Sequence, residues 1–137
     1  MNEKFMNEAI EEAKKADFPY GAVVVKDNQI IARAGTAKKD SIDPTAHAEI
    51  TAIRQACDKL QTKNLQGSIL YSTCEPCPMC FTAAWWANVK EIVFGMSLKD
   101  SSRLMGQELE VSSKYLNSAG RNKIKLTGNL MRDEIIS

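Results

Sequence analysis

The sequence predicts an α/β protein, a three-layer α/β/α sandwich built on a five-stranded mixed sheet. Apolar residues recur at helical spacing in some segments and form short strand-like runs in others, and the two kinds of segment alternate along the chain. Strands separated by helices favour a largely parallel sheet with helices on both faces, apart from one hairpin near the N-terminus. With 44% hydrophobic residues in 137, we expect residues 1–137 to form a single domain.

The chain begins with a predicted helix and hairpin. Apolar side chains recur at helical spacing over residues 3–16, which predicts an amphipathic helix. Two apolar runs then follow, at residues 22–25 and 29–32. The pair Asp27-Asn28 between them is typical of a tight turn, so these runs predict an antiparallel hairpin.

A polar segment separates this hairpin from a second predicted helix. Residues 36–43 are polar and predict a loop. Asp43 is suited to the N-cap and Pro44 to the first helical position, so we expect a helix from there to about Leu60.

The second half of the chain alternates short apolar runs with helical segments. We expect strands at residues 68–72, 91–95 and 123–126, and helices at residues 75–86, 102–118 and 129–136.

Charge and targeting signals exclude some classes of function. Eighteen basic residues against seventeen acidic ones leave none of the excess that sequence-independent nucleic-acid binders carry. The one basic cluster, Lys114, Arg121, Lys123 and Lys125, is interpreted as solvated surface. The N-terminal segment lacks the apolar run of a signal peptide or membrane span, so we expect a cytoplasmic protein without a membrane partner.

The stretch STCEPCPMC at residues 72–80 holds three of the four cysteines, Cys74, Cys77 and Cys80. A reducing cytosol disfavours a disulfide, and Cys57 is poorly spaced to complete an iron–sulfur cluster. A redox pair, a structural zinc site and a catalytic zinc site stay open. The start of a helix favours the thiolate form of Cys77 and Cys80, which is the form that binds metals.

A third zinc ligand is available at the start of the other central helix. His47 is the only histidine in the sequence, and a lone histidine there is usually a surface or capping residue. However, both predicted helices follow a strand or its loop, and in α/β sheets such helix starts gather at one edge. His47, Cys77 and Cys80 can therefore converge, with the fourth position of a catalytic zinc left to water.

Glu49 supplies the chemistry that a structural zinc site would not need. A carboxylate beside the metal can take a proton from the attacking water and pass it to a leaving group. On one helix, residues two apart point about 160° from each other, so the zinc must lie beyond the helix end. The joint pattern, His47-Ala48-Glu49 with Pro76-Cys77 and Cys80, is typical of zinc-dependent nucleobase deaminases.

The segments DPTAHAEI and EPCPMC resemble the cytidine deaminase-like superfamily, in the bacterial branch that holds guanine deaminase and the tRNA-editing adenosine deaminase. This resemblance implies a five-stranded α/β/α sandwich and Zn²⁺ as the cofactor. It implies that His47, Cys77 and Cys80 bind the metal, that Glu49 carries protons, and that Cys74 only packs. It also implies a homodimer, in which Trp85 or Trp86 could lie at the interface.

The residues around the cysteines resemble guanine deaminase more than the tRNA enzyme. Two features depart from it: Thr36 stands where the superfamily commonly has a substrate-contacting asparagine, and the chain stops at Ser137, where bacterial guanine deaminases continue. Glu108 falls near an acidic substrate contact of those enzymes. The expected substrate is guanine or a related heterocyclic amine; the alternatives are adenosine in tRNA, cytosine or another heterocycle, and a non-enzymatic zinc module.

Four residues are candidates for substrate contacts. Tyr20 is the preferred stacking residue, and Phe18, Trp85 and Trp86 are better interpreted as core aromatics. The backbone beside Ala48, at a helix start, can help to hold the base. The set of substrate candidates is Tyr20, Thr36, Ala48 and Glu108.

Overall fold

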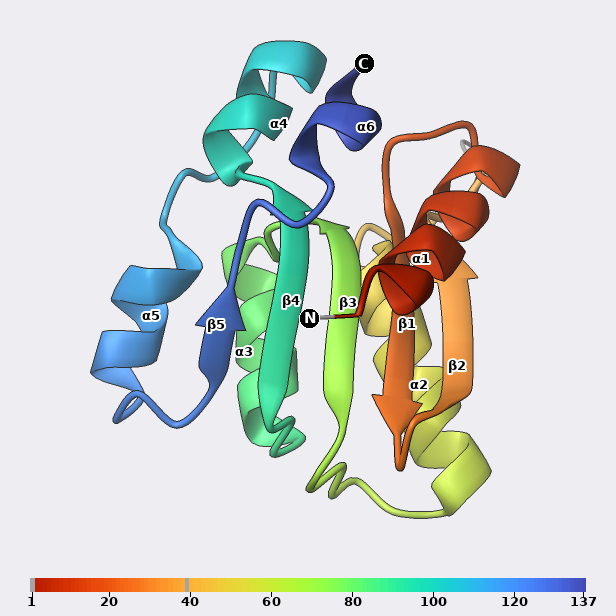
Figure 1. Cartoon of the computed structure of the whole chain (residues 1–137), viewed down its shortest axis with the longest axis vertical. Coiled ribbons are helices and arrows are strands. Elements are labelled where there is room, and N and C mark those ends of the chain that lie inside the picture. The colour runs from red at the N-terminus through yellow and green to blue at the C-terminus, as the bar shows by residue number, and fades with distance from the viewer. Residues whose placement is uncertain (1, 39) are drawn as a thin grey trace.

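The computed structural model describes residues 2–38 and 40–137, in which five strands form one sheet flanked by six helices (Figure 1). Met1, and Lys39 in the predicted loop, lie outside the described residues. The helices are α1 (Glu3–Lys15), α2 (Ala48–Leu60), α3 (Pro78–Trp86), α4 (Leu98–Met105), α5 (Ser113–Ala119) and α6 (Arg132–Ile136). The strands are β1 (Gly21–Lys26), β2 (Gln29–Gly35), β3 (Ile69–Cys74), β4 (Glu91–Met96) and β5 (Lys125–Thr127).

The sheet is mixed, as predicted, with strand order β2-β1-β3-β4-β5. β3 pairs in parallel with β4, and β4 with β5. The expectation that only the hairpin is antiparallel was wrong, because β1 is antiparallel to β3 as well as to β2. The reason is that β1 lies between β2 and β3, which run in the same direction and are joined through α2.

The predicted hairpin is confirmed and its turn has the expected chemistry. Asp27 and Asn28 have positive φ angles of 52° and 62°. Asp and Asn tolerate this conformation, and two such residues give a turn whose twist matches the flanking strands.

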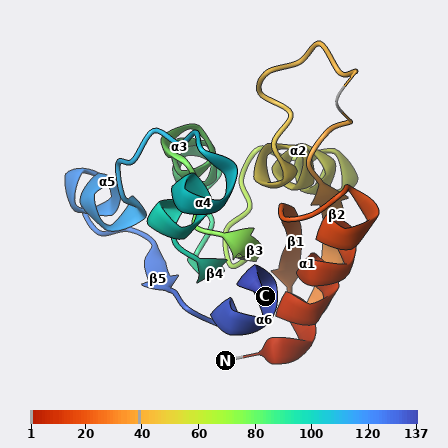
Figure 2. The ribbon, with the colours of Figure 1, turned by 90° about the horizontal axis from the view of Figure 1, so that it is seen from above.

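The three-layer arrangement is also confirmed, and Figure 2 shows it from above. Alternate residues of β1 point to opposite faces of the sheet. Ala22 and Val24 join the core under α2 and α3, whereas Val23 and Val25 join the core under α1 and α6. No helix in the described ranges is long and apolar enough to cross a membrane.

α2 begins later than predicted, and this correction matters for the site. Asp43 does not cap the helix: its carboxylate accepts hydrogen bonds from the backbone N–H and the hydroxyl of Thr45, at 2.8 and 2.6 Å. The aspartate therefore forms a local turn, and the chain becomes helical only at Ala48. His47 is the N-cap and has an extended backbone (φ −69°, ψ 159°).

α3 is likewise displaced, from the predicted Glu75-Pro76 to Pro78, with Cys77 as the N-cap. Proline at the first helical position suits this start, because its missing N–H would have no helical partner. Glu75 does not start the helix, because its carboxylate oxygens accept the backbone N–H groups of Leu98 and Ser113, at 3.1 and 2.8 Å. Glu75 therefore connects the N-termini of α4 and α5 to the loop before α3.

The predicted helix over residues 102–118 is two helices. Ser97 and Asp100 form a capping box that starts α4 upstream of the prediction. Gly106, with φ 85°, ends α4, and Ser112 caps α5. Glycine adopts this left-handed conformation without strain, so the chain turns away here. The shifts at β3, β5 and α6 are confined to their boundaries.

Asp100 also connects α4 to the C-terminal helix. Its carboxylate accepts two hydrogen bonds from the Arg132 guanidinium, both at 2.8 Å. This ion pair holds the pKa of Asp100 well below its usual range. Because its folded-state pKa is lowered, the stabilisation is present above the unfolded pKa of about 3.9 and is lost as the pH falls through the folded value.

We expect Asp100→Asn to lower the melting temperature at pH 7 by about 5 °C, since charge-assisted hydrogen bonds are lost in a domain of this size. The difference from wild type should shrink as the pH falls below about 4, because the carboxyl group is then protonated in the unfolded state, and it should vanish only once the folded state is protonated too. Thermal unfolding followed by circular dichroism from pH 3 to pH 8 measures both effects. Asp133→Asn, which alters a side chain that is 90% exposed, is the control. Equal melting temperatures for Asp100→Asn and wild type at pH 7 would contradict this account.

Candidate metal centre and active site

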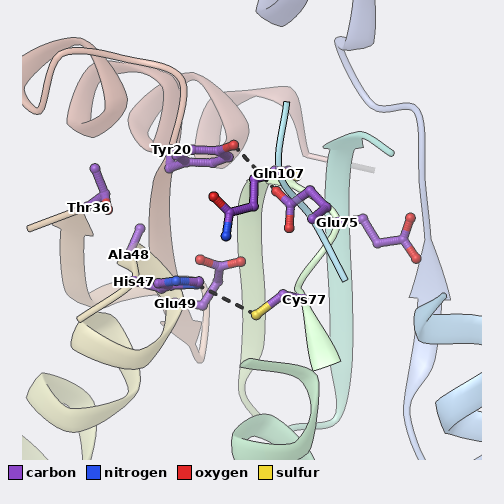
Figure 3. A pocket seen from close by; sticks show the side chains of 10 residues that line it. Tyr20, Thr36, His47, Ala48, Glu49, Glu75, Cys77 and Gln107 are labelled. Carbon is purple, nitrogen blue, oxygen red and sulfur yellow. Dashed lines mark hydrogen bonds between the residues drawn. The ribbon is translucent and has the colours of Figure 1, made fainter. Parts of the chain in front are cut away.

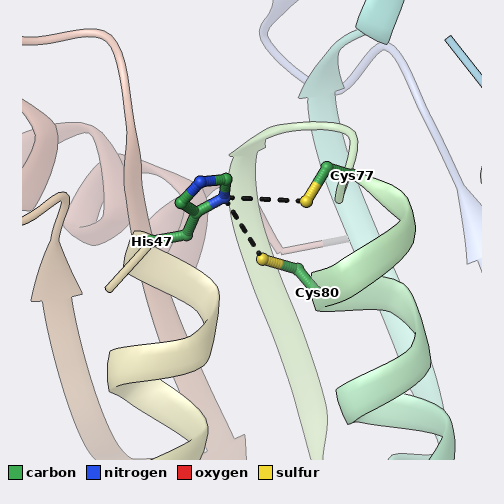
Figure 4. Close-up of side chains that lie close together, drawn as sticks. All are labelled: His47, Cys77 and Cys80. Carbon is green, nitrogen blue, oxygen red and sulfur yellow. Dashed lines mark hydrogen bonds between the residues drawn. The ribbon is translucent and has the colours of Figure 1, made fainter. Parts of the chain in front are cut away.

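Three metal-binding side chains meet where α2 and α3 begin (Figure 4). The Nδ1 atom of His47 lies 3.6 Å from the Sγ atoms of both Cys77 and Cys80. Tetrahedral zinc, with Zn–S near 2.3 Å and Zn–N near 2.0 Å, places its nitrogen and sulfur ligands about 3.6 Å apart. The three side chains therefore fit a zinc ion as they stand, and the predicted convergence is confirmed.

The topology explains why these residues meet. β2 and β3 run in the same direction, so their carboxyl ends lie at the same edge of the sheet. α2 and α3 follow those ends, and each contributes its N-cap, His47 or Cys77, at this edge. Helix N-termini favour negative charge, so they stabilise the thiolates that zinc requires.

The interaction between the two thiol groups separates their pKa values. A hydrogen bond from Cys80, together with one from His47, lowers the pKa of Cys77 to about 4. The same hydrogen bond, together with burial, raises the pKa of Cys80. Cys77 is therefore ready as a thiolate, and binding of zinc must displace the Cys80 proton.

The other two cysteines do not join this group. All four cysteines are free. Cys74 is buried in the core on the α1 side of the sheet, and burial raises the pKa of its thiol. Cys57 lies in the last turns of α2, far from the helix start where His47 stands. The disulfide and iron–sulfur alternatives are thus not supported by the positions of the cysteines.

Glu49 lies beside the three ligands, inside α2. Because His47 precedes the helix, the two side chains are not held on opposite sides of it, and the difficulty raised by their spacing disappears. Figure 3 shows the Glu49 carboxylate next to the His47 ring in the same cavity. Burial raises the pKa of Glu49 to about 7, and the charge of Cys77 acts in the same direction. A carboxyl group with a near-neutral pKa can both take and give a proton.

A cavity of about 160 Å³ opens above these side chains (Figure 3). The four predicted substrate contacts all line it; whether they bind substrate stays a prediction. Gln107 and Glu75 also line it and were missed, because the α4–α5 connection looked helical and Glu75 looked like a helix start. The lining residues are Tyr20, Thr36, His47, Ala48, Glu49, Cys74, Glu75, Cys77, Gln107 and Glu108.

The other aromatic candidates lie outside this lining. Phe18 packs against the core on the α1 side. The indole N–H of Trp85 donates to the Gly120 carbonyl at 3.0 Å, and Trp86 is 72% exposed. Phe18 and Trp85 agree with their interpretation as core aromatics, whereas for the exposed Trp86 that interpretation was wrong.

Two members of the predicted basic cluster have partners within the protein. The Lys123 ammonium donates to the Trp85 carbonyl at 2.8 Å and lies 4.1 Å from the Trp85 ring centre. Lys125 lies 3.9 Å from the Glu91 carboxylate. The Lys125 side chain is 73% exposed, which agrees with the interpretation of the cluster as solvated surface.

Structural zinc sites use four protein ligands, whereas catalytic zinc sites use three and leave one position open. The site here has three protein ligands, beside a cavity and a buried carboxylate, so it has the arrangement of a catalytic site. The fold and the site thus define a zinc-dependent α/β protein with a pocket of base size. The family model for the cytidine and deoxycytidylate deaminase zinc-binding region matches residues 1–96. The chain belongs to this family.

Two curated proteins and one solved structure illustrate the relationship. The chain is 49% identical over 84 residues to guanine deaminase of Bacillus subtilis (strain 168), covering 61% of this chain and 54% of that protein. It is 43% identical over 96 residues to the tRNA-specific adenosine deaminase of Aquifex aeolicus (strain VF5), covering 67% and 64%. The matched part of the chain thus spans between half and two thirds of the length of each of these relatives. A solved structure of a tRNA:A34 deaminase superposes with a TM-score of 0.77 at 31% identity, covering 98% of this chain and 97% of that one.

Proposed function

We propose that residues 1–137 form a single zinc-dependent deaminase domain that releases ammonia from an amino-substituted nucleobase, with guanine or a related free base as the substrate. The observation that carries this proposal is the buried Glu49 carboxylate beside the three-ligand site, inside a cavity of base size. A purely structural metal site has no use for such a carboxylate. This favours an enzyme over a non-enzymatic zinc module.

The reaction is hydrolytic: water adds to the carbon that bears the amine, and ammonia leaves. Zinc, when bound by His47, Cys77 and Cys80, polarises the attacking water and lowers its pKa. Glu49 accepts the two protons of that water in turn, and it delivers the first to the ring nitrogen and the second to the amine that leaves as ammonia. Burial raises the pKa of this carboxyl group above its usual range, which favours a group that both accepts and donates protons.

The pocket favours a neutral base rich in N–H groups. Its volume of about 160 Å³ is close to that of an engineered site of about 150 Å³ that holds one benzene molecule, so one small heterocycle fits. Among the described residues that line it, three are glutamates and none is lysine or arginine. Carboxylates accept hydrogen bonds from amino and ring N–H groups, which guanine offers. Tyr20 can lie against the flat ring.

Adenosine in tRNA is the second candidate substrate. The match over nearly the whole solved tRNA:A34 deaminase supports it, and a base turned out of an RNA loop would occupy the same pocket. The balanced net charge and the internal partners of Lys123 and Lys125 argue against an extended RNA surface. RNA binding that weakens steeply with salt would favour this candidate.

We expect the zinc-loaded protein to release ammonia from guanine faster than from adenine, cytosine, isocytosine, pterins or aminotriazines. A coupled ammonia assay over this panel measures it, with the metal-free protein as the control. Activity on another base but not on guanine would identify Thr36 as a candidate determinant of specificity. Silence on every free base, with activity on an anticodon stem-loop, would contradict the free-base proposal in favour of the tRNA substrate.

A homodimer and a cytoplasmic location complete the proposal. The exposed indole of Trp86 supports an interface on the α3 side of the molecule, because a large apolar side chain at the surface is often covered by a partner. The four free cysteines agree with a reducing compartment.

A further inference from the structure

Three side chains from separate segments form a hydrogen-bonded group at one wall of the pocket. Tyr20 precedes β1, Ser101 lies in α4, and Glu108 follows α4. The Ser101 hydroxyl lies 2.6 Å from the Tyr20 hydroxyl and 2.6 Å from Oε2 of Glu108. The Tyr20 hydroxyl also lies 3.4 Å from the same carboxylate oxygen. We call this group the Tyr20–Ser101–Glu108 triad.

The triad has one consistent arrangement of protons. The single hydroxyl proton of Ser101 is donated to Glu108, so Ser101 accepts the proton of Tyr20. Burial raises the pKa of Tyr20 to about 12, so its hydroxyl keeps its proton at neutral pH. Ser101 is completely buried, which removes competition from water.

The local fold brings these groups together. Asp100, next to Ser101, is fixed by the α4 capping box and by Arg132. The left-handed Gly106 then reverses the chain, so that Glu108 returns toward Ser101. Ser101 is therefore attached to a rigid helix start, whereas Glu108 lies on an irregular segment and depends on the triad for its position.

Ser101 donates to Oε2 of Glu108, and the Tyr20 hydroxyl lies 3.4 Å from the same oxygen. The other carboxylate oxygen, Oε1, has no hydrogen-bond partner among residues 2–38 and 40–137, and Glu108 lines the cavity. This oxygen can accept an N–H group of a bound base. Without Ser101, the side chain of Glu108 would be free to adopt other rotamers.

We propose that Ser101 is a positioning residue that fixes the Glu108 carboxylate, and thereby makes the pocket select bases that offer a ring N–H group to it. This inference rests on the proposed function and names the device that gives it selectivity. Ser101 is not among the residues that line the cavity, so it acts through Glu108.

The test compares Ser101→Ala and Tyr20→Phe with wild type; each variant loses one oxygen and gains no bulk. The substrates are guanine, 1-methylguanine and 9-methylguanine, in which a methyl group replaces one ring N–H. Ser113→Ala is the matched control, because Ser113 is also fully buried but its hydroxyl donates to the Pro76 carbonyl.

We expect wild type to discriminate against one of the two methylated bases. Ser101→Ala should raise KM for guanine about 10-fold with little change in kcat, the loss typical of one hydrogen bond to a charged group. It should leave kcat/KM for the disfavoured methylated base unchanged. Tyr20→Phe should show a smaller effect of the same kind, since Tyr20 donates to Ser101 and supports Glu108 mainly through it. Equal losses on all three bases, or no loss, would overturn the positioning role while leaving the proposed function intact.

A second readout needs no substrate. The ¹³C resonance of the Glu108 side-chain carboxylate at pH 7 should move in Ser101→Ala but not in Ser113→Ala, since it reports hydrogen bonding to that group. If wild type released ammonia from none of the bases, the proposed function and the claimed selectivity would both be overturned. The carboxylate resonance would then still decide whether Ser101 holds Glu108, and an unmoved resonance would overturn that as well.

Discussion

Replacing Cys77 by serine should cost the protein its zinc and, with it, all ammonia release. Cys77 is the ligand best prepared for the metal, since its pKa of about 4 makes it a thiolate at neutral pH. A serine hydroxyl stays protonated there and cannot replace it. Loss of an outer partner of a metal ligand already costs roughly 10- to 100-fold in affinity, so we expect the loss of a ligand to exceed about 100-fold.

The measurement is zinc content after dialysis, by atomic emission, together with a competition titration against a chelator. Cys57→Ser is the matched control, because it makes the same chemical change on α2 away from the metal ligands. Wild type and Cys57→Ser should each retain one zinc per chain. Retention of one tightly bound zinc by Cys77→Ser would remove Cys77 from the ligand set.

Glu49→Gln should separate chemistry from metal binding. Glutamine has the size of glutamate but cannot accept a proton at neutral pH. We expect zinc content to remain at one per chain and ammonia release to fall by at least about 10²- to 10⁴-fold, the usual contribution of a positioned general acid–base group. The melting temperature should change little or rise, because a buried carboxyl group with a raised pKa is replaced by a neutral one.

Steady-state ammonia release and zinc content, measured on the same preparation, test this expectation. Glu110→Gln, an exposed change on the α4–α5 connection, serves as the control. Near-normal turnover by Glu49→Gln would exclude Glu49 as the proton carrier. The two substitutions thus give different results: Cys77→Ser loses metal and turnover, and Glu49→Gln loses turnover alone.

The residues that are positioned to bind the metal could be predicted, because their chemistry is local and their placement follows from topology. Cysteines three residues apart at a helix start present both sulfurs to one side, and the helices that follow parallel strands begin at one sheet edge. His47 could be joined to Cys77 and Cys80 on these grounds, and the structure brings the three together. The hairpin turn at Asp27-Asn28 could also be predicted from the sequence, since few residue types accept the positive φ angles that it requires.

Structural features were mispredicted where several segments of the chain offer hydrogen-bond partners to one residue. Asp43 and Glu75 both have the chemistry of helix starts, but Asp43 binds Thr45 and Glu75 binds the backbone of Leu98 and Ser113. The prediction of one helix over residues 102–118 was wrong because Gly106 ends α4 and Ser112 caps α5, although the composition of the segment is helical. The antiparallel β1–β3 pairing was missed because strand neighbours cannot be read from strand order along the chain.

The sequence by itself determined the kinds of elements, the three-layer class and the set of zinc ligands, since periodicity, caps and ligand chemistry are properties of short segments. Only the tertiary structure decided where the helices begin, and therefore that His47 lies outside α2 with Glu49 inside it. It also decided that Tyr20, Ser101 and Glu108 meet at the pocket. The contacts of Tyr20 with Ser101 and Glu108 join residues 81 and 88 positions apart, so they depend on the packing of the whole chain rather than on any local pattern.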